Sequence, residues 1–288
     1  MEKIKVLDLF SGLGSFSLGL ERAGMATSAF VEIDPYCRAV LDKHWPSVPV
    51  HDDVTTRDFK QGEADVITGG FPCQDVSYAG TRAGVSGARS GLYREVVRAI
   101  RLVRPKFALL ENVAALLGNG MGRVLGDVAE DGLDAEWDCV SVGELGAPHG
   151  RDRVWIAIAD ANQFERQNGR RKGLGWWLWK PEETETARNA DGLWKLQPPR
   201  LLGDIRRRID NATGPRAWWS CDWKTKFETF RRMDDGPAHG SFDRSDEASA
   251  VKALGNTLCP FIAELWGGSI LSCIQKKENH EKIFSKSK

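Results

Sequence analysis

Apolar and polar positions alternate along the first 160 residues in a way that predicts strands and helices in turn. Apolar runs typical of buried strands occupy residues 4–10, 28–33, 48–51, 64–68, 107–111, 137–142 and 154–159. Apolar residues at helical spacing predict one helix after residue 15, a second from Pro35 and a third over 92–103. In the third, Leu92, Val96 and Ile100 lie on the same face. Alternating strands and helices predict an α/β fold with a doubly wound, mostly parallel sheet.

The alternation stops near residue 160. Residues 161–245 are rich in Arg, Trp, Gly and Pro, and a helical pattern resumes only with Ile262, Trp266 and Ile270. We therefore divide the chain into a domain over 1–160, an irregular region over 161–245, a segment over 246–275 that returns to the first domain, and a flexible tail over 276–288.

Composition narrows the class of protein. The chain of 288 residues is 41% hydrophobic and 28% charged, as in ordinary soluble globular proteins. It has no apolar run of bilayer length, and its first residues lack the apolar core of a secretion signal. Its six cysteines are scattered without a CxxC pair, which argues against a zinc site and a disulfide framework. We expect a cytoplasmic protein without a bound metal.

The net charge is zero, but basic and acidic residues are unevenly distributed along the chain. Residues 161–233 carry 16 basic and 9 acidic side chains, so the remainder has 24 against 31. A basic segment in an otherwise acidic chain indicates a surface that faces a polyanion, and a well-solvated face is the alternative.

A glycine turn follows the first predicted strand. Phe10, Gly12 and Gly14 lie between that strand and the next helix, where glycine lets a ligand approach the backbone. Glu32 ends the second strand, where an acid can accept hydrogen bonds from ribose hydroxyls, and Asp53 follows the third. These residues predict an adenosine pocket without distinguishing a dinucleotide from S-adenosylmethionine.

Two further strands bring reactive side chains to the same edge. Cys73 follows the fourth strand and Glu111 ends the fifth. Taken alone, Cys73 is either an inert turn residue or a nucleophile, and Glu111 either a structural carboxylate or an acid. We expect burial to raise the pKa of Glu111, so that it can hold and donate a proton. Arg151 and Arg153 precede the last strand on one side, where they can grip an oxygen atom or pair with Asp152.

Seven motifs, read in order, resemble those of the cytosine-5 DNA methyltransferases, in the compact form of bacteria and phages. They are DLFSGLG, the EID at 32–34, DDVT, GGFPCQDVS, ENV, HGRDRVW and LGNTLCP, and they cover about residues 4–160 and 251–275. The resemblance implies a Rossmann-like methyltransferase fold whose 1–160 domain binds S-adenosyl-L-methionine and whose 161–245 region recognises the target. The implied cofactor-binding residues are Phe10, Gly12, Leu13, Gly14, Glu32, Asp53, Pro72, Leu92, Asn256 and Thr257.

The resemblance also assigns the chemistry. Cys73 would attack carbon 6 of a cytosine, Glu111 would protonate ring nitrogen 3, and Arg153 would hold the carbonyl oxygen. Arg151 would support this site, and Gln74, in a loop that closes over DNA, would lie near the flipped base. Flipping the base from a duplex costs a few kcal/mol.

The implied partners are double-stranded DNA and, in a restriction-modification system, a cognate restriction endonuclease. We expect a monomer with no membrane association. Basic residues of the 161–245 region would contact phosphates. An RNA cytosine-5 methyltransferase on the same fold is the alternative within the class. A nicotinamide-dependent dehydrogenase would use the glycine turn and Glu32 equally well, and a non-catalytic DNA-binding protein would use the basic segment alone.

Two positions depart from the family pattern. Ser15 stands where the family has a glycine, and His149 stands where it has a glutamine. We expect Ser15 to crowd the cofactor slightly and His149 to add a titratable group near the target base.

Overall fold

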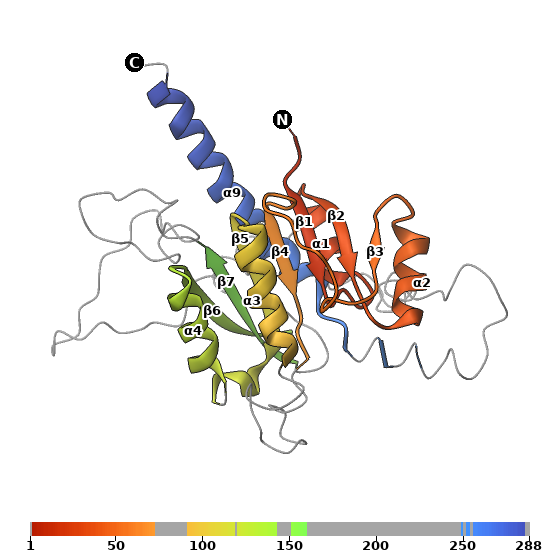
Figure 1. Cartoon of the computed structure of the whole chain (residues 1–288). Helices are drawn as coiled ribbons and strands as arrows, with labels where there is room; N and C mark the ends of the chain where they lie inside the picture. The colour runs from red at the N-terminus through yellow and green to blue at the C-terminus, as the bar shows by residue number, and fades with distance from the viewer. Residues whose placement is uncertain are drawn as a thin grey trace, which may run out of the picture.

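A single seven-stranded sheet organises the part of the chain that the computed structural model describes, which comprises residues 2–72, 91–118, 120–142, 151–159, 249, 252–253 and 256–285, with the backbone alone over 276–285 (Figure 1). The strands are β1 (Lys5–Leu9), β2 (Ala26–Val31), β3 (Val50–His51), β4 (Val66–Gly69), β5 (Phe107–Val113), β6 (Asp134–Ser141) and β7 (Asp152–Ala159). The helices are α1 (Ser15–Arg22), α2 (Pro35–His44), α3 (Gly91–Val103), the 3-10 turn η3 (Ala114–Leu117), α4 (Met121–Glu130) and α9 (Pro260–Ser285).

The strand order is β3-β2-β1-β4-β5-β7-β6, and every neighbouring pair from β3 to β5 is parallel. Strand β7 runs antiparallel to both β5 and β6. The predicted mostly parallel α/β sheet is thus confirmed. The chain proceeds outward in one direction through β1, β2 and β3 and in the other through β4 and β5, so the topological switch point lies between β1 and β4. Ligands of such sheets bind at the carboxyl edge beside this point.

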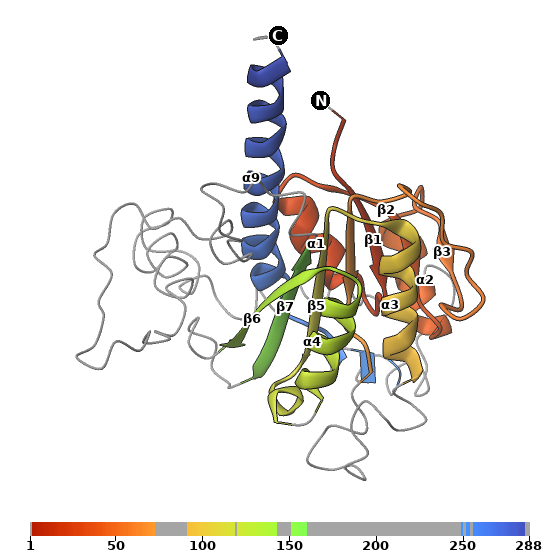
Figure 2. The ribbon, with the colours of Figure 1, turned by 60° about the vertical axis from the view of Figure 1, so that its left-hand side comes forward.

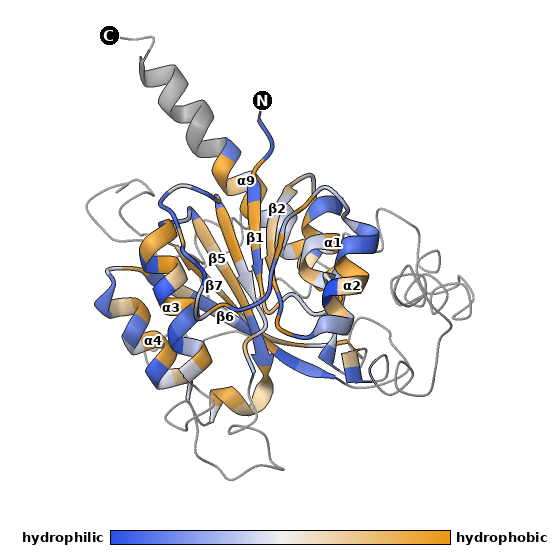
Figure 3. Ribbon diagram, turned by 45° about the vertical axis from the view of Figure 1, so that its right-hand side comes forward, coloured by the Kyte–Doolittle hydropathy of each residue, from blue (hydrophilic) through white to orange (hydrophobic). Residues whose placement is uncertain are grey.

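Helices cover both faces of the sheet (Figures 2 and 3). One face packs on α1 and the first part of α9 through residues such as Leu20, Trp155 and Trp266. The other face packs on α3 and α4, where Val96 and Val124 are fully buried against the strands. Alternate residues of each strand enter opposite cores, which explains the continuous apolar runs in the sequence.

Helix α2 begins at an explicit capping signal. The Asp34 carboxylate accepts hydrogen bonds from the backbone N–H groups of Tyr36 and Cys37, and Pro35 occupies the first helical turn. Pro35 lacks an N–H that would need an acceptor there, so both residues favour a helix start at this point.

Two elements differ from the sequence-based predictions. Helix α4 was not predicted, because Gly122 and Gly126 weaken its local helix propensity; it forms by burying Met121, Val124 and Val128. Helix α9 continues to Ser285, so the backbone over 276–285 is helical where a frayed tail was expected. Its last turns project beyond the sheet (Figures 1 and 2). No helix in the described part of the chain is both long and apolar enough to cross a membrane.

Candidate functional site

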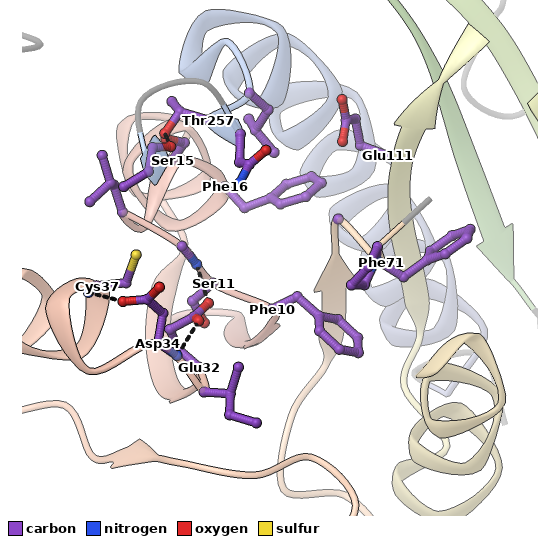
Figure 4. A pocket seen from close by; sticks show the side chains of 18 of the residues that line it. Phe10, Ser11, Ser15, Phe16, Glu32, Asp34, Cys37, Phe71, Glu111 and Thr257 are labelled. Carbon is purple, nitrogen blue, oxygen red and sulfur yellow. Dashed lines mark hydrogen bonds between the residues drawn. The ribbon is translucent and has the colours of Figure 1, made fainter. Parts of the chain in front are cut away.

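A cavity of about 520 Å³ opens at the carboxyl edge of the sheet, beside the switch point between β1 and β4. Figure 4 shows side chains that line it, contributed by segments far apart in the sequence. The lining includes nine of the ten predicted cofactor-binding residues: Phe10, Gly12, Leu13, Glu32, Asp53, Pro72, Leu92, Asn256 and Thr257. It also includes Glu111, Arg151 and Arg153. Tertiary structure therefore brings nine predicted cofactor-binding residues and three of the five predicted catalytic residues to one cavity.

Residues of the glycine turn after β1 line part of this cavity. Phe10 has φ 53°, and Gly12 and Gly14 have φ 52° and 78°, so three residues of the turn adopt left-handed backbone conformations. A non-glycine residue in this region carries a conformational cost, and such residues concentrate at functional sites.

Gly14, the one predicted cofactor residue outside the cavity lining, has a packing role. A Cβ atom at this position would lie 2.8 Å from the Trp45 ring and 2.9 Å from Leu41. Gly14 therefore lets the start of α1 approach α2 closely. Trp45 itself is fixed by its indole N–H, which donates to the carboxylate of Glu21 at 3.0 Å.

The Glu32 carboxylate is held between two segments of backbone. Its Oε2 accepts from the N–H of Gly12 at 2.7 Å, and its Oε1 accepts from the N–H of Asp34 at 2.8 Å. The residue is 8% exposed, and burial raises the pKa of its carboxyl. Glu32 lines the cavity, and each of its carboxylate oxygens can accept a further hydrogen bond, so the group can accept from ligand hydroxyls.

The opposite side of the cavity carries an ion pair between β5 and β7. The Nε atom of Arg153 lies 2.8 Å from Oε1 of Glu111. In the antiparallel register Arg153 is opposite Val113 and Trp155 is opposite Glu111, so all four side chains share one face of the sheet. The carboxylate that pairs with Arg153 is therefore that of Glu111. Pairing with Asp152, the alternative given by the sequence, is not observed for Arg153.

Burial sets the protonation of this pair. It raises the pKa of Glu111 to about 7, although the charges of Arg153 and Arg151 act in the opposite direction. The cause is visible in the packing: Trp155, which pairs with Glu111 across the strands, is fully buried edge-on against Phe16, with ring centroids 5.5 Å apart. The predicted upward shift of the Glu111 pKa is confirmed. A carboxyl with a pKa near 7 can both hold and release a proton at neutral pH.

Arg151 lies in the same part of the cavity. Burial and the neighbouring charge of Arg153 lower the pKa of Arg151, and its Nε atom is buried with no hydrogen-bond partner among the described residues. Two guanidinium groups beside one acid can bind a carbonyl or phosphate oxygen of a ligand.

Asp8 and Asn112 are two further residues beside the cavity to which no sequence-based role was assigned. Asp8 is fully buried and accepts hydrogen bonds from the hydroxyls of Thr68 at 2.7 Å and Ser17 at 2.9 Å, which ties β1 to β4 and α1. Asn112 donates from Nδ2 to the carbonyl of Phe71 at 3.1 Å and so fixes the exit of β4. Each is a polar residue within an otherwise apolar strand, and that pattern in the sequence could have indicated a buried hydrogen-bonding role.

Several predicted residues lie outside the described part of the chain. These are Cys73, Gln74, His149 and the whole 161–245 region. Pro72, the last residue described before Cys73, is exposed at the rim of the cavity. The predicted roles of Cys73 and Gln74 remain predictions.

A doubly wound sheet with a glycine turn, an acid at the end of β2 and a separate buried acid–guanidinium pair defines a class: α/β proteins that bind a nucleotide-like cofactor beside a reactive site. The family model for C-5 cytosine-specific DNA methylases matches residues 4–189. The chain belongs to this family.

Similar proteins agree with this assignment. Over 171 residues the chain is 37% identical to the Type II methyltransferase M2.BsuMI of Bacillus subtilis, covering 56% of this chain and 43% of that protein. It is 28% identical to the Type II methyltransferase M.AquIA of Picosynechococcus, covering 75% of this chain and 93% of that protein. The crystal structure of S. pombe Dnmt2 methyltransferase has the same fold, with a TM-score of 0.55 at 15% identity over 94% of this chain and 99% of that one. The chain spans less than half the length of M2.BsuMI and of several other Type II relatives.

Proposed function

We propose that this protein is a DNA cytosine-5 methyltransferase that uses S-adenosyl-L-methionine as its methyl donor. The observation that carries the proposal is the single cavity that joins Glu32 and the glycine turn to the Glu111–Arg153 pair. Membership of the C-5 cytosine-specific DNA methylase family supports the choice of reaction. The glycine turn and Glu32 alone would serve a dehydrogenase equally well, but that activity has no use for the buried acid–guanidinium pair.

The cavity suits the proposed cofactor. Its volume of about 520 Å³ falls within the usual range for small-molecule sites. Glu32 can accept from the ribose hydroxyls, and Phe10, Leu13 and Val54 provide apolar surface for the base. The buried hydroxyl of Ser15 has no hydrogen-bond partner among the described residues, as expected for a group that awaits a ligand. When bound, S-adenosylmethionine supplies an electrophilic methyl group.

The proposed roles of the chain's own residues follow from the cavity. Glu111 donates its proton to ring nitrogen 3 of the cytosine, while Arg153 holds the carbonyl oxygen and Arg151 supports it. Cys73, as the thiolate, forms a bond to carbon 6, which makes carbon 5 electron-rich enough to attack the methyl group. Loss of the carbon 5 proton then expels the thiolate, and return of the nitrogen 3 proton to Glu111 leaves the neutral aromatic ring and regenerates the acid. The cytosine reaches these groups by flipping out of the duplex.

The proposed substrate is double-stranded DNA, bound in part by the basic 161–245 region. The matched relatives are named Type II methyltransferases, which supports a cognate restriction endonuclease as a proposed partner. We further propose that the protein acts as a monomer.

The first experiment measures transfer of labelled methyl groups from S-adenosylmethionine to unmethylated duplex DNA. We expect transfer by the intact protein, none by Cys73→Ser, and wild-type transfer by the control Cys139→Ser, whose cysteine lies on β6 outside the cavity lining. Equal transfer by Cys73→Ser would remove Cys73 as the nucleophile. Transfer to tRNA instead of DNA would favour the RNA methyltransferase alternative. Mapping the methylated cytosines identifies the recognition sequence.

A further inference from the structure

The part of the cavity wall that follows β3 receives little support from the sheet. Strand β3 has only two residues and lies at the edge of the described sheet, paired with β2 alone. Asp52, Asp53 and Val54 come directly after it and line the cavity. The chain over 52–65, which we call the β3–β4 loop, contains no helix or strand. Contacts from outside the sheet must therefore hold this wall in place.

Arg98 on α3 supplies such contacts. Its Nη2 donates to the carbonyl of Val54 at 2.6 Å, and its Nη1 donates to the carbonyl of Arg57 at 3.2 Å. The guanidinium carbon lies 4.8 Å from the ring centroid of Phe59, which is buried. One side chain thus contacts the β3–β4 loop at three positions and ties it to α3.

The guanidinium of Arg98 is itself oriented by its own helix. Its Nε donates to Oε2 of Glu95 at 2.6 Å, from the preceding turn of α3. All three guanidinium nitrogens therefore have an acceptor, and their planar arrangement fixes the two loop carbonyls relative to each other. Arg57, the second cation over the Phe59 ring, is held by Glu63 at 2.7 Å.

Arg98 acts on the cavity without lining it. Val54 lines the cavity, and so does Leu92 at the start of α3, whereas Arg98 does not. Asp53 precedes Val54, and its Oδ1 accepts from the N–H and the hydroxyl of Thr55, both at 2.8 Å. Its Oδ2 has no hydrogen bond within the described part of the chain and can accept from a ligand. A shift of the Val54 carbonyl would move this carboxylate with it.

We propose that Arg98 is a positioning residue that fixes the Asp53–Val54 wall against α3 and thereby sets the selectivity for the base of the cofactor. This inference rests on the proposed function, because it takes the adenine of S-adenosylmethionine as the group beside this wall. A carboxylate accepts a hydrogen bond from the amine of adenine and repels a carbonyl oxygen at the same place. Such discrimination requires the wall to be held to within about 0.5 Å.

The test compares two ligands that differ only in the base. S-adenosylhomocysteine carries the amine, and S-inosylhomocysteine carries a carbonyl oxygen instead. We expect the wild-type protein to prefer S-adenosylhomocysteine. Arg98→Met keeps an unbranched side chain but removes every donor, so it should weaken S-adenosylhomocysteine binding about tenfold and reduce the ratio of the two affinities by about threefold or more. Isothermal titration calorimetry measures both affinities.

The ratio separates positioning from stability. A smaller folded fraction weakens the apparent binding of both ligands by the same factor, which cancels in the ratio. Arg98→Lys keeps the charge without the planar fork, so it should also reduce the ratio, by less than Arg98→Met. Arg101→Met is the matched control, because it removes a guanidinium of the same helix that pairs with Asp131 at 2.7 Å, and neither residue lines the cavity. This control should leave both affinities unchanged.

Three results would overturn the proposal. They are an unchanged ratio in Arg98→Met, unchanged binding of S-adenosylhomocysteine by this variant, and equal affinity of the wild-type protein for the two ligands. Failure of the wild-type protein to bind S-adenosylhomocysteine at all would instead overturn the proposed function.

Discussion

Glu111 illustrates how a residue gains its chemistry from its surroundings. A glutamate is ordinarily ionised at neutral pH, but burial raises the pKa of Glu111 to about 7 even with Arg153 at 2.8 Å. The desolvation therefore outweighs the attraction of the cation. A proton is thus available at the position where the proposed reaction needs one.

This shift predicts a specific pH dependence of stability. Because burial raises the pKa of Glu111 from its usual 4.5 to about 7, the folded protein still holds, between these two pH values, a proton that the unfolded chain has already lost. The free energy of unfolding, taken as wild type minus Glu111→Gln, should therefore fall by an amount on the order of 3 kcal/mol as the pH rises through this window. Subtracting the variant cancels other buried acids such as Asp8.

Urea denaturation at several pH values measures this difference. A difference that rises with pH would mean that Arg153 dominates and that Glu111 is an ordinary ion-paired carboxylate. The same variant should also abolish methyl transfer without preventing cofactor binding, since Glu111 is proposed to act on the cytosine.

At the scale of elements, the contact between α1 and α9 positions the cavity wall. Gly19 of α1 lies directly against the start of α9: a Cβ atom there would overlap the carbonyl oxygen of Pro260 and lie 2.7 Å from Cβ of Ala263. Thr257 and Leu258, which line the cavity, precede Pro260 by only a few residues. Close approach of the two helices thus places this part of the wall.

Two glycines in these helices provide a matched test. Gly19→Ala should destabilise the protein by about 1–3 kcal/mol, because backbone atoms of α9 must move. Gly268→Ala on α9 meets no atom within 4 Å and should stabilise by roughly 0.5–1 kcal/mol through helix propensity. Denaturant unfolding checks both. If the two variants have equal stability, the close packing of α1 on α9 does not hold in solution.

At the scale of the whole molecule, an ion pair joins two segments that lie far apart in the sequence. Lys252 Nζ lies 3.0 Å from Oδ2 of Asp34, which also caps α2, and Ala253 packs against Leu13 and Val40. The segment that carries Asn256 and Thr257 is thereby held against the glycine turn. Lys252 and Asp34, which both line the cavity, are 218 positions apart in the sequence, so this part of the lining forms only when the chain is folded.

The ion pair predicts a salt-dependent cofactor affinity. Lys252→Ala should weaken S-adenosylhomocysteine binding about two- to fivefold at low salt, the range expected of an exposed pair, and by little at 1 M salt. Calorimetry at both salt concentrations measures this. Lys106→Ala is the matched control, because it breaks another exposed pair, with Asp65 at 3.1 Å, whose residues are not in the cavity lining. An identical salt dependence in wild type and Lys252→Ala would contradict a role for the pair in the cavity.

Local patterns in the sequence were sufficient for much of the architecture. The apolar runs and helical stripes predicted all seven strands and most helices, since burial on both faces of a parallel sheet leaves a direct compositional trace. The glycine turn and Glu32 were also predictable, because both follow their strands at fixed short distances. Helix α4 was missed, since its stability depends on packing more than on propensity.

Only tertiary structure decided how the reactive groups meet. Reversal of β7 brings the start of that strand, and with it Arg153, to the carboxyl edge where Glu111 lies, and no local pattern specifies that direction. The pKa of Glu111, the unpaired hydroxyl of Ser15 and the Lys252–Asp34 contact likewise depend on residues distant in sequence. Electrostatic and hydrogen-bonding states are set by neighbours in space, so the sequence determined which groups are present and the fold determined what each can do.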